Sequence, residues 1–405
     1  MWDTTGAMGV GIGRGIIVAR QGACMERSDQ CTGMGAKDDR ASDGTPLIAV
    51  PNCAGDVADS NDSVQSADSV RVLTSVDSTN TYATSSVRRA LAEDDIDCVD
   101  VVRGLFDDGH AESSATESSA VASDSEQRVP MSVVLSDTQT AGRGRLDRTW
   151  YNEPGESFVG TFVTAVPKAL LDGGSSGWMT MAAGLAAIDA LEKTTGLAVV
   201  DRQNEAGYDG CSGCVKNVHD NDNQVAQGDD HDGRVQHDQT GPRLALKWPN
   251  DVYLAGRKLG GILAELAAVR GDTAIVVFGI GLNLFVPADR LPTDQSTSLQ
   301  LQVNALPEYA ELRNRIANGI ASSLRHRLTL LAADPVAAAE TLRKETVAVS
   351  WTLGRHVTAR LAQNGVTSGQ VVEGVAESIN ADASLTIRIA DDEIVTVTTG
   401  DVGVE

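Results

Sequence analysis

Apolar positions along the chain fall into short blocks that are separated by polar stretches. Runs of β-branched and other apolar residues predict strands, and recurrence at three- and four-residue spacing predicts helices. The expected strands are 70–76, 131–137, 157–166, 197–201, 244–248, 250–254, 258–269 and 273–286. The expected helices are 77–93, 177–196, 307–332 and 335–347. Pro307 and Pro335 suit first-turn positions of the last two helices, because a first-turn residue needs no N–H partner.

Polar stretches interrupt this pattern and suggest how the chain is divided. Residues 1–69 are rich in Gly, Asp and Ser without a sustained period, so we expect them to be irregular or disordered. Residues 107–128 and 202–243 have the polar composition of surface insertions. From Trp351 onward, short strands separated by Gly and Asn turns indicate a small all-β domain. The expected domains are a main one at 70–348, which carries both insertions, and a small one at 349–405.

Charge and composition exclude several classes of protein. The 405 residues carry a formal net charge of −23, which argues against general binding to nucleic acid or anionic membranes. No apolar run approaches the roughly 18 residues that span a bilayer, and the start of the chain lacks the pattern of a signal peptide. The six cysteines mostly fall in polar stretches, so we expect reduced thiols in a cytoplasm.

One segment of the acidic chain concentrates positive charge. The sequence QTAGRGRLDRTW, residues 139–150, holds Arg143, Arg145 and Arg148. Gly142 and Gly144 allow the backbone to approach a ligand closely, and guanidinium groups suit carboxylate or phosphate oxygens. The segment is therefore either a solvated loop, a nucleic-acid contact or a cradle for a small anion.

A second segment, LKWPNDVYLAGRKLGGILAEL at 246–266, combines amide, carboxylate and ammonium groups. Pro249 interrupts the strand and places Asn250 and Asp251 at a turn. An Asn amide can bind a base or ribose, and an Asp carboxylate can hold Mg²⁺ near phosphates. Lys258 opens the next strand, whose paired glycines leave room for a ligand against the sheet. The alternative is a plain hairpin with a surface lysine.

Five motifs occur in one order along the chain. They are Ser78-Thr79-Asn80, Gln139–Trp150, Lys247–Asp251, Arg257–Glu265 and Gly279–Asn283. Together they resemble the biotin–protein ligase family, which is marked by S-T-N, Q-x-x-G-R-G-R-x-x-R-x-W, K-W-P-N-D, R-K-L-x-G-I-L-x-E and G-x-G-x-N. The resemblance covers roughly 70–405. It implies an α+β fold: a class II aminoacyl-tRNA-synthetase-like catalytic domain with a mixed sheet, followed by a small SH3-like β-barrel.

The resemblance also implies roles for individual residues. Those at the biotin end would be Ser78, Thr79, Asn80, Gln139 and Gly261. Arg143, Gly144 and Arg145 would form a loop that closes over biotin and the ATP phosphates, and Lys258 would reach the biotin carboxylate and the α-phosphate. Those around ATP would be Arg148, Trp150, Asn250 and Asn283. Asp251 would help to hold Mg²⁺. The catalytic set is therefore expected to be Arg143, Arg145, Lys258 and Asp251.

The implied reaction joins biotin to a protein in two steps. ATP and biotin would form biotinyl-5′-AMP, and a lysine of a biotin carboxyl carrier domain of an acyl-CoA carboxylase would then displace AMP. A cationic loop suits this chemistry, since it neutralises two anions that must meet and excludes water from a labile anhydride. The acceptor lysine must also lose a proton, for which Asp251 is our candidate. Oligomeric state stays open between a monomer and a weak homodimer.

The sequence departs from the family pattern in three places. Asp147 stands where the family usually has glycine, between Arg145 and Arg148. Residues 1–69 show no three-helix pattern, so we expect the monofunctional type without an N-terminal DNA-binding domain. The last residues, GDVGVE, stop where relatives often continue with an arginine that contacts ATP, which puts that contact in doubt.

Other interpretations remain. Cys211 and Cys214, with His219, His231 and His237 downstream, could hold zinc, but the spacing matches no zinc module that we can justify. A lipoate–protein ligase would be expected to show R-R-x-x-G-G-G, which is absent. An octanoyltransferase would need a cysteine nucleophile in a motif. A non-catalytic binding module is a different class, against which the retained lysine, aspartate and arginines argue.

Overall fold

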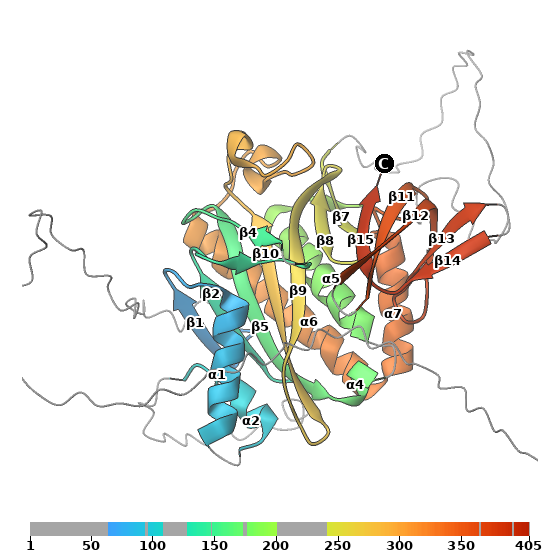
Figure 1. Ribbon diagram of the computed structural model, residues 1–405. Helices are drawn as coiled ribbons and strands as arrows, with labels where there is room; N and C mark the ends of the chain where they lie inside the picture. Colours follow the sequence, from blue (N-terminus) through green and yellow to red (C-terminus); the bar gives the residue numbers. More distant parts are fainter. Residues whose placement is uncertain are drawn as a thin grey trace, which may run out of the picture.

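A computed structural model describes residues 64–404 apart from 94–95, 108–127, 147, 173–175, 201–240, 364–365 and 391–392. An eight-stranded mixed sheet forms the centre of the main domain, in the order β1-β2-β5-β10-β9-β8-β7-β6 (Figure 1). Its strands are β1 Ser69–Leu73, β2 Met131–Ser136, β5 Ser157–Pro167, β6 Ala198–Val199, β7 Arg243–Lys247, β8 Asp251–Leu254, β9 Arg257–Arg270 and β10 Thr273–Asn283. The central strands are apolar and long, and β5, β10 and β9 pair antiparallel.

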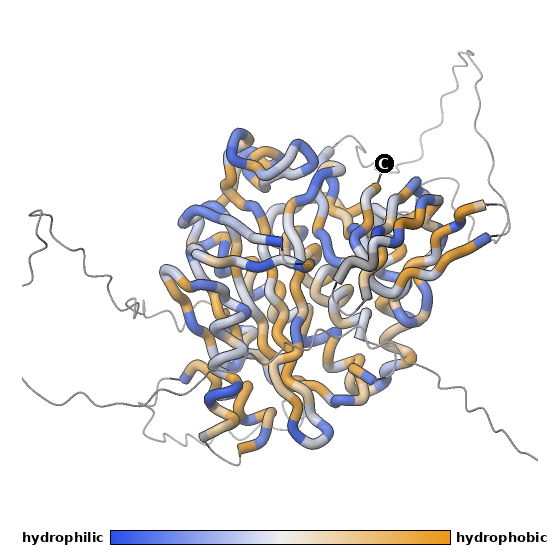
Figure 2. The backbone as a smooth tube through the Cα atoms, in the orientation of Figure 1, coloured by the Kyte–Doolittle hydropathy of each residue, from blue (hydrophilic) through white to orange (hydrophobic). Residues whose placement is uncertain are grey.

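Helices cover both faces of this sheet. One face packs against α5 (Ser176–Thr195) and α6 (Tyr309–Ala333), which enclose the larger apolar core. The helix α7 (Pro335–Ala348) packs on these two helices and on β12 (Val366–Ile379) of the small β domain. The other face is covered at one end by α1 (Thr79–Glu93) and α2 (Cys98–Arg103) around a smaller apolar cluster. Apolar residues are frequent along the central strands in Figure 2, and polar residues along many of the connecting loops. A short helix, α4 (Ala169–Asp172), and two 3₁₀ turns, Ala288–Arg290 and Leu299–Leu301, complete the domain.

A second sheet of five antiparallel strands follows, in the order β14-β13-β12-β11-β15. Its strands are β11 His356–Gln363, β12 Val366–Ile379, β13 Leu385–Ala390, β14 Glu393–Val397 and β15 Gly400–Val404. Trp248 anchors it to the main domain, because its backbone N–H donates to Thr352 Oγ1 at 2.9 Å and its indole donates to the carbonyl of Ala383 at 2.8 Å. The small β domain therefore packs directly beside the turn that follows Lys247.

Most expected elements are present, with shifts of a few residues at their ends. Two expectations were wrong in detail: Pro307 precedes α6, which begins at Tyr309, and 197–201 forms only the two-residue β6. The arginine segment, expected as a loop, contains a hairpin of β3 (Gly142–Arg143) and β4 (Thr149–Trp150). Neither this hairpin nor α2 was expected from the sequence.

Several expectations fall outside the described residues. They include the irregular character of 1–63, most of both insertions, Asp147, and the proposed Cys211/Cys214 site. Among the residues that are described, Cys98 is a buried free thiol, and no helix is both long and apolar enough to cross a membrane.

Candidate active site

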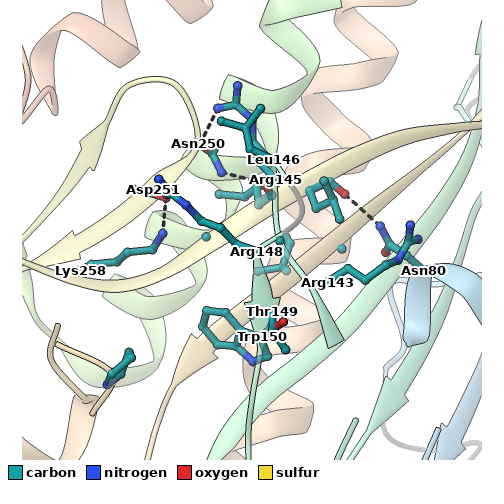
Figure 3. A pocket seen from close by; sticks show the side chains of 18 of the residues that line it. Asn80, Arg143, Arg145, Leu146, Arg148, Thr149, Trp150, Asn250, Asp251 and Lys258 are labelled. Carbon is teal, nitrogen blue, oxygen red and sulfur yellow. Dashed lines mark hydrogen bonds and ion pairs between the residues drawn. The ribbon is translucent and has the colours of Figure 1, made fainter. Parts of the chain in front are cut away.

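A cavity of about 410 Å³ lies on the α1 side of the sheet, under the β3–β4 hairpin. Its walls come from α1, the hairpin, β8–β10, the 292–296 loop and β15, and Figure 3 shows the side chains that line it. Thirteen expected site residues line the cavity: Ser78, Thr79, Asn80, Gln139, Arg143, Gly144, Arg145, Arg148, Trp150, Asn250, Asp251, Lys258 and Gly261. Segments spread over some 180 residues of sequence therefore meet in one place.

The floor of the cavity is built from glycines on adjacent strands. Gly281 of β10 pairs with Gly261 of β9 and Val159 of β5, so all three point to the same face of the sheet. A Cβ at Gly281 would lie 2.8 Å from the Trp150 ring, and one at Gly261 would lie 3.3 Å from Asp251 Oδ1. The absence of side chains thus lets the Trp150 ring lie against β10 and leaves room over β9 for the Asp251 carboxylate.

Asn80 lies over the next row of the sheet, where Thr161, Gly279 and Leu263 are aligned across β5, β10 and β9. Its Oδ1 accepts a hydrogen bond from Thr161 Oγ1 at 2.7 Å, and its Nδ2 donates to the carbonyl of Leu263 at 3.1 Å. A Cβ at Gly279 would lie 2.4 Å from Asn80 Oδ1, so only glycine leaves room for this amide. The second residue of α1 is therefore fixed to three strands.

The hairpin is a tight structure that places its three arginines separately. Gly144 N–H donates to the carbonyl of Arg148 at 2.7 Å, and Leu146 at the tip has a φ of 54°, a left-handed conformation that is uncommon outside glycine. Arg143 forms an ion pair with Glu265 of β9, and Arg148 with Asp401 of β15. Both guanidinium groups are thus paired with carboxylates, and an anionic ligand would have to compete with Glu265 or Asp401 for them.

Arg145 joins the two domains at the cavity. Its Nη1 donates to Asn250 Oδ1 at 2.8 Å, while its Nη2 donates to Thr399 Oγ1 and the carbonyl of Gly400, each at 3.2 Å. Burial lowers the pKa of Arg145, and Asp251 and Asp401 counteract that effect. Because only a planar fork reaches all three acceptors, this arginine ties the Asn250 turn to the small β domain.

Asp251 lies between two ammonium groups. Lys258 Nζ is 2.7 Å from its Oδ1 and Lys247 Nζ is 3.4 Å from its Oδ2. Burial alone raises the pKa of Asp251, but the two lysines outweigh it and the net pKa lies below the ordinary value. Burial lowers the pKa of Lys247, against the opposing charge of Asp251. The group carries one net positive charge, which suits an anionic ligand.

Gln139 fixes the base of the hairpin to α1. Its Oε1 accepts from the backbone N–H of Thr79 at 2.7 Å, and its own N–H donates to Asn152 Oδ1 at 3.1 Å. Behind it, the buried guanidinium of Arg313 donates to Asp137 Oδ1 at 2.6 Å. The hairpin is therefore held at its base by α1 and α6.

One expected site residue lies elsewhere. Asn283 does not line the cavity; it is buried, and its Nδ2 donates to the carbonyl of Thr297 at 3.0 Å. Conversely, Lys247, Gly400 and Asp401 line the cavity although sequence reasoning gave them no role. Lys247 belonged to a motif and could have been found, whereas nothing in the local sequence marked Asp401.

Asp251, the expected magnesium ligand, is surrounded by ammonium groups. Both oxygens of Asp251 face ammonium groups, and the described residues contain no cluster of three or more acidic, His or Cys side chains that could hold a metal. Magnesium usually takes carboxylates together with substrate phosphates. Both Asp251 oxygens are thus engaged by lysines, and we derive no step through the ion.

Comparisons with known proteins agree with this arrangement. The sequence model of the Biotin/lipoate A/B protein ligase family matches residues 123–283, which carry the hairpin, both lysines and the glycine floor. A biotin–[acetyl-CoA-carboxylase] ligase of Mycobacterium tuberculosis is 29% identical over 274 residues, covering 67% of this chain and 77% of that protein. The corresponding ligase of Paracoccus denitrificans is 30% identical over 151 residues, 37% of this chain and 43% of that protein.

A solved structure, biotin protein ligase from Aquifex aeolicus in complex with biotin and ATP, aligns with 83% of this chain and 98% of that one, at 17% identity and a TM-score of 0.47. The family match and the mycobacterial ligase supply the sequence relationship. Residues 123–283 of the chain therefore match the Biotin/lipoate A/B protein ligase family.

Proposed function

We propose that the chain is a biotin–protein ligase. It activates biotin with ATP as biotinyl-5′-AMP and transfers the biotinyl group to a lysine of an acceptor protein. The observation that carries this proposal is the gathering of Arg143, Arg145, Lys247 and Lys258 around one cavity in a chain of net charge −23. In so acidic a chain, that concentration of cations favours a ligand with several negative charges.

In the first half-reaction, a biotin carboxylate oxygen bonds to the α-phosphorus of ATP and pyrophosphate leaves. Lys258 and Arg145 lie near the Asn250–Asp251 turn, where they neutralise the carboxylate and the phosphate as these approach. The main contribution of the protein is positioning and electrostatic stabilisation. Trp150 supports an adenosine position beside Gly281, since its indole N–H has no hydrogen-bond partner among the described residues.

In the second half-reaction, the acceptor amine attacks the acyl carbon, AMP leaves, and the amine gives up a proton. The sequence suggested Asp251 as an aid to this proton loss. Because two ammonium groups lower its pKa, Asp251 is a weak base, and holding Lys247 and Lys258 in place is the role that its contacts favour. Arg145 and the hairpin would shield the anhydride from water between the two steps.

Some narrower expectations belong to the same proposal. The acceptor is a biotin carboxyl carrier domain of an acyl-CoA carboxylase, and the enzyme works in the cytoplasm without binding nucleic acid. The five-stranded C-terminal sheet is the SH3-like domain of the family, and its turn at Thr399–Gly400 supports Arg145. Lipoate ligation is the main competing activity, because the matching family includes lipoate ligases.

Pyrophosphate release tests the proposal directly. The full chain is incubated with ATP and biotin, lipoate or octanoate, and labelled biotin is followed onto a carrier domain. Biotin-dependent release and lysine labelling are expected. Release with lipoate or octanoate but not with biotin would refute a biotin ligase, and binding of biotin with no release would favour a non-catalytic module.

A further inference from the structure

We propose that Glu265 is a positioning residue that sets specificity for a ligand ring bearing N–H groups, by orienting Asn80 and Arg143 at one end of the cavity. This inference rests on the proposed function, in which that end receives the ureido ring of biotin. Glu265 itself does not line the cavity, so it acts through its two partners.

Glu265 joins two elements that are distant in sequence. Its Oε2 accepts from Asn80 Nδ2 at 2.8 Å and from Arg143 Nη2 at 2.9 Å. Asn80 comes from α1, Arg143 from the hairpin, and Glu265 from β9, on the same face of the sheet as Gly261 and Leu263. Figure 3 shows Asn80 and Arg143 together at one end of the cavity, with Asp251 and Lys258 at the other.

The Glu265 carboxylate and the carbonyl of Leu263 together decide which way the Asn80 amide points. A threonine hydroxyl can donate or accept, so Thr161 alone would tolerate either orientation of the amide. A carboxylate and a backbone carbonyl only accept, so Glu265 and the carbonyl of Leu263 require the NH₂ group on their side. Oδ1 is thereby turned to Thr161, where it keeps one lone pair.

This orientation determines what the end of the cavity can recognise. Both N–H groups of Asn80 are committed to protein acceptors, so Asn80 meets a ligand only as an acceptor. The ureido ring of biotin offers N–H donors, whereas a dithiolane ring offers none. A buried acceptor left without a donor costs binding energy, so the arrangement favours a ureido ring over an apolar ring of similar size.

Arg143 depends on Glu265 in a different way. Its side chain is 47% exposed, and Glu265 is its ion-pair partner in the described part of the chain. A long side chain at the surface loses its preferred place readily when its partner is removed. Removal of the carboxylate is therefore expected to free the side chains of Asn80 and Arg143 together.

Two substitutions separate these effects. Glu265→Gln keeps an acceptor for Asn80 but removes the charge that holds Arg143, and Glu265→Leu removes both. The KM for biotin is expected to rise about threefold in the first variant and about thirtyfold in the second, with kcat and the KM for ATP within about twofold of wild type. Desthiobiotin, which keeps the ureido group, should lose affinity in parallel with biotin.

Control variants keep the inference falsifiable. Thr161→Val disturbs the same amide from the other side and should also raise the KM for biotin. Glu377→Gln breaks a comparable Arg–Glu pair, with Arg388 on the C-terminal sheet, and should leave the KM unchanged. If Glu265→Leu fails to fold, as judged by circular dichroism, Glu265→Gln and Thr161→Val decide the matter.

The possible failures are distinguishable. A wild-type chain that adenylates biotin, together with Glu265 variants whose KM for biotin is unchanged, overturns this inference and leaves the proposed function standing. Equal losses in the KM for biotin and for ATP would show a merely structural role. A wild-type chain that does not adenylate biotin overturns both proposals.

Discussion

Asp251 holds the ammonium groups of Lys258 and Lys247 on its two carboxylate oxygens, at 2.7 and 3.4 Å. Lys247 is 8% exposed at its side chain and Asp251 11%, so the pair is shielded from solvent. Removing the carboxylate leaves buried positive charge without a partner, which is among the costlier changes a protein can suffer. The carboxylate is thus as much a structural requirement of the cavity as a chemical one.

We therefore expect Asp251→Asn to lower the free energy of unfolding by about 3 kcal/mol. Urea denaturation followed by circular dichroism measures this change. Asp172→Asn is the matched control, because its pair with Lys168 is half-exposed and its loss should cost at most about 0.5 kcal/mol. Equal losses in the two variants would contradict the importance of burial. Transfer from preformed biotinyl-adenylate, measured on the same Asp251 variant, tests separately for proton acceptance.

The ionisation of Asp251 should affect how the free energy of unfolding changes at acid pH. Its folded pKa lies below the ordinary aspartate value of 3.8, so the ionised carboxylate stabilises the fold at every pH above that value. The contribution disappears as the pH falls through the folded pKa. The difference in unfolding free energy between wild type and Asp251→Asn should be constant from about pH 5 to 7 and shrink below about pH 4. A difference that grows towards acid pH would show that the carboxylate is destabilised in the fold.

Much of this site could be predicted from sequence because its motifs lie on strands with clear apolar patterns. Lys258 and Gly261 lie near the start of β9, where the apolar pattern of 258–269 predicted a strand and the family resemblance assigned their roles. Ion pairs between residues that are far apart in the sequence could not be predicted in this way. Asp401 is 253 residues from Arg148, and Glu265 is 122 residues from Arg143, so no local pattern joins them.

Asn283 was expected at the site from motif order, but it does not line the cavity. Motif order placed it with the ligand-binding residues, yet its amide supports the 297 loop through the carbonyl of Thr297. Alternation along β10 predicts the same face for Asn283 as for Gly279 and Gly281, which line the cavity. The strand ends at Asn283, however, and its amide donates to the loop at Thr297 instead.

Arg145 provides a prediction about geometry rather than charge. Arg145→Lys keeps a cation but cannot reach Asn250, Thr399 and Gly400 together. We expect kcat/KM for adenylation to fall about a hundredfold, measured by pyrophosphate release. Arg148→Lys is the control, since its ion pair with Asp401 needs only one contact, and its loss should be within about fivefold. Similar losses in both variants would mean that only charge matters.

The glycine floor yields the last prediction, because two of its residues lie under different side chains. In Gly281→Ala the new methyl group would lie 2.8 Å from the Trp150 ring, and in Gly279→Ala it would lie 2.4 Å from Asn80 Oδ1. Each substitution should displace its own neighbour. Gly281→Ala should raise the KM for ATP about tenfold with little change for biotin, and Gly279→Ala should do the reverse.

Gly104→Ala, whose methyl group would meet nothing closer than 3.6 Å, is the control and should change neither value. Steady-state kinetics with each substrate varied in turn measures both constants, and a loss shared equally by the two substrates in either variant would contradict the division of the cavity into an adenosine end and a ring end.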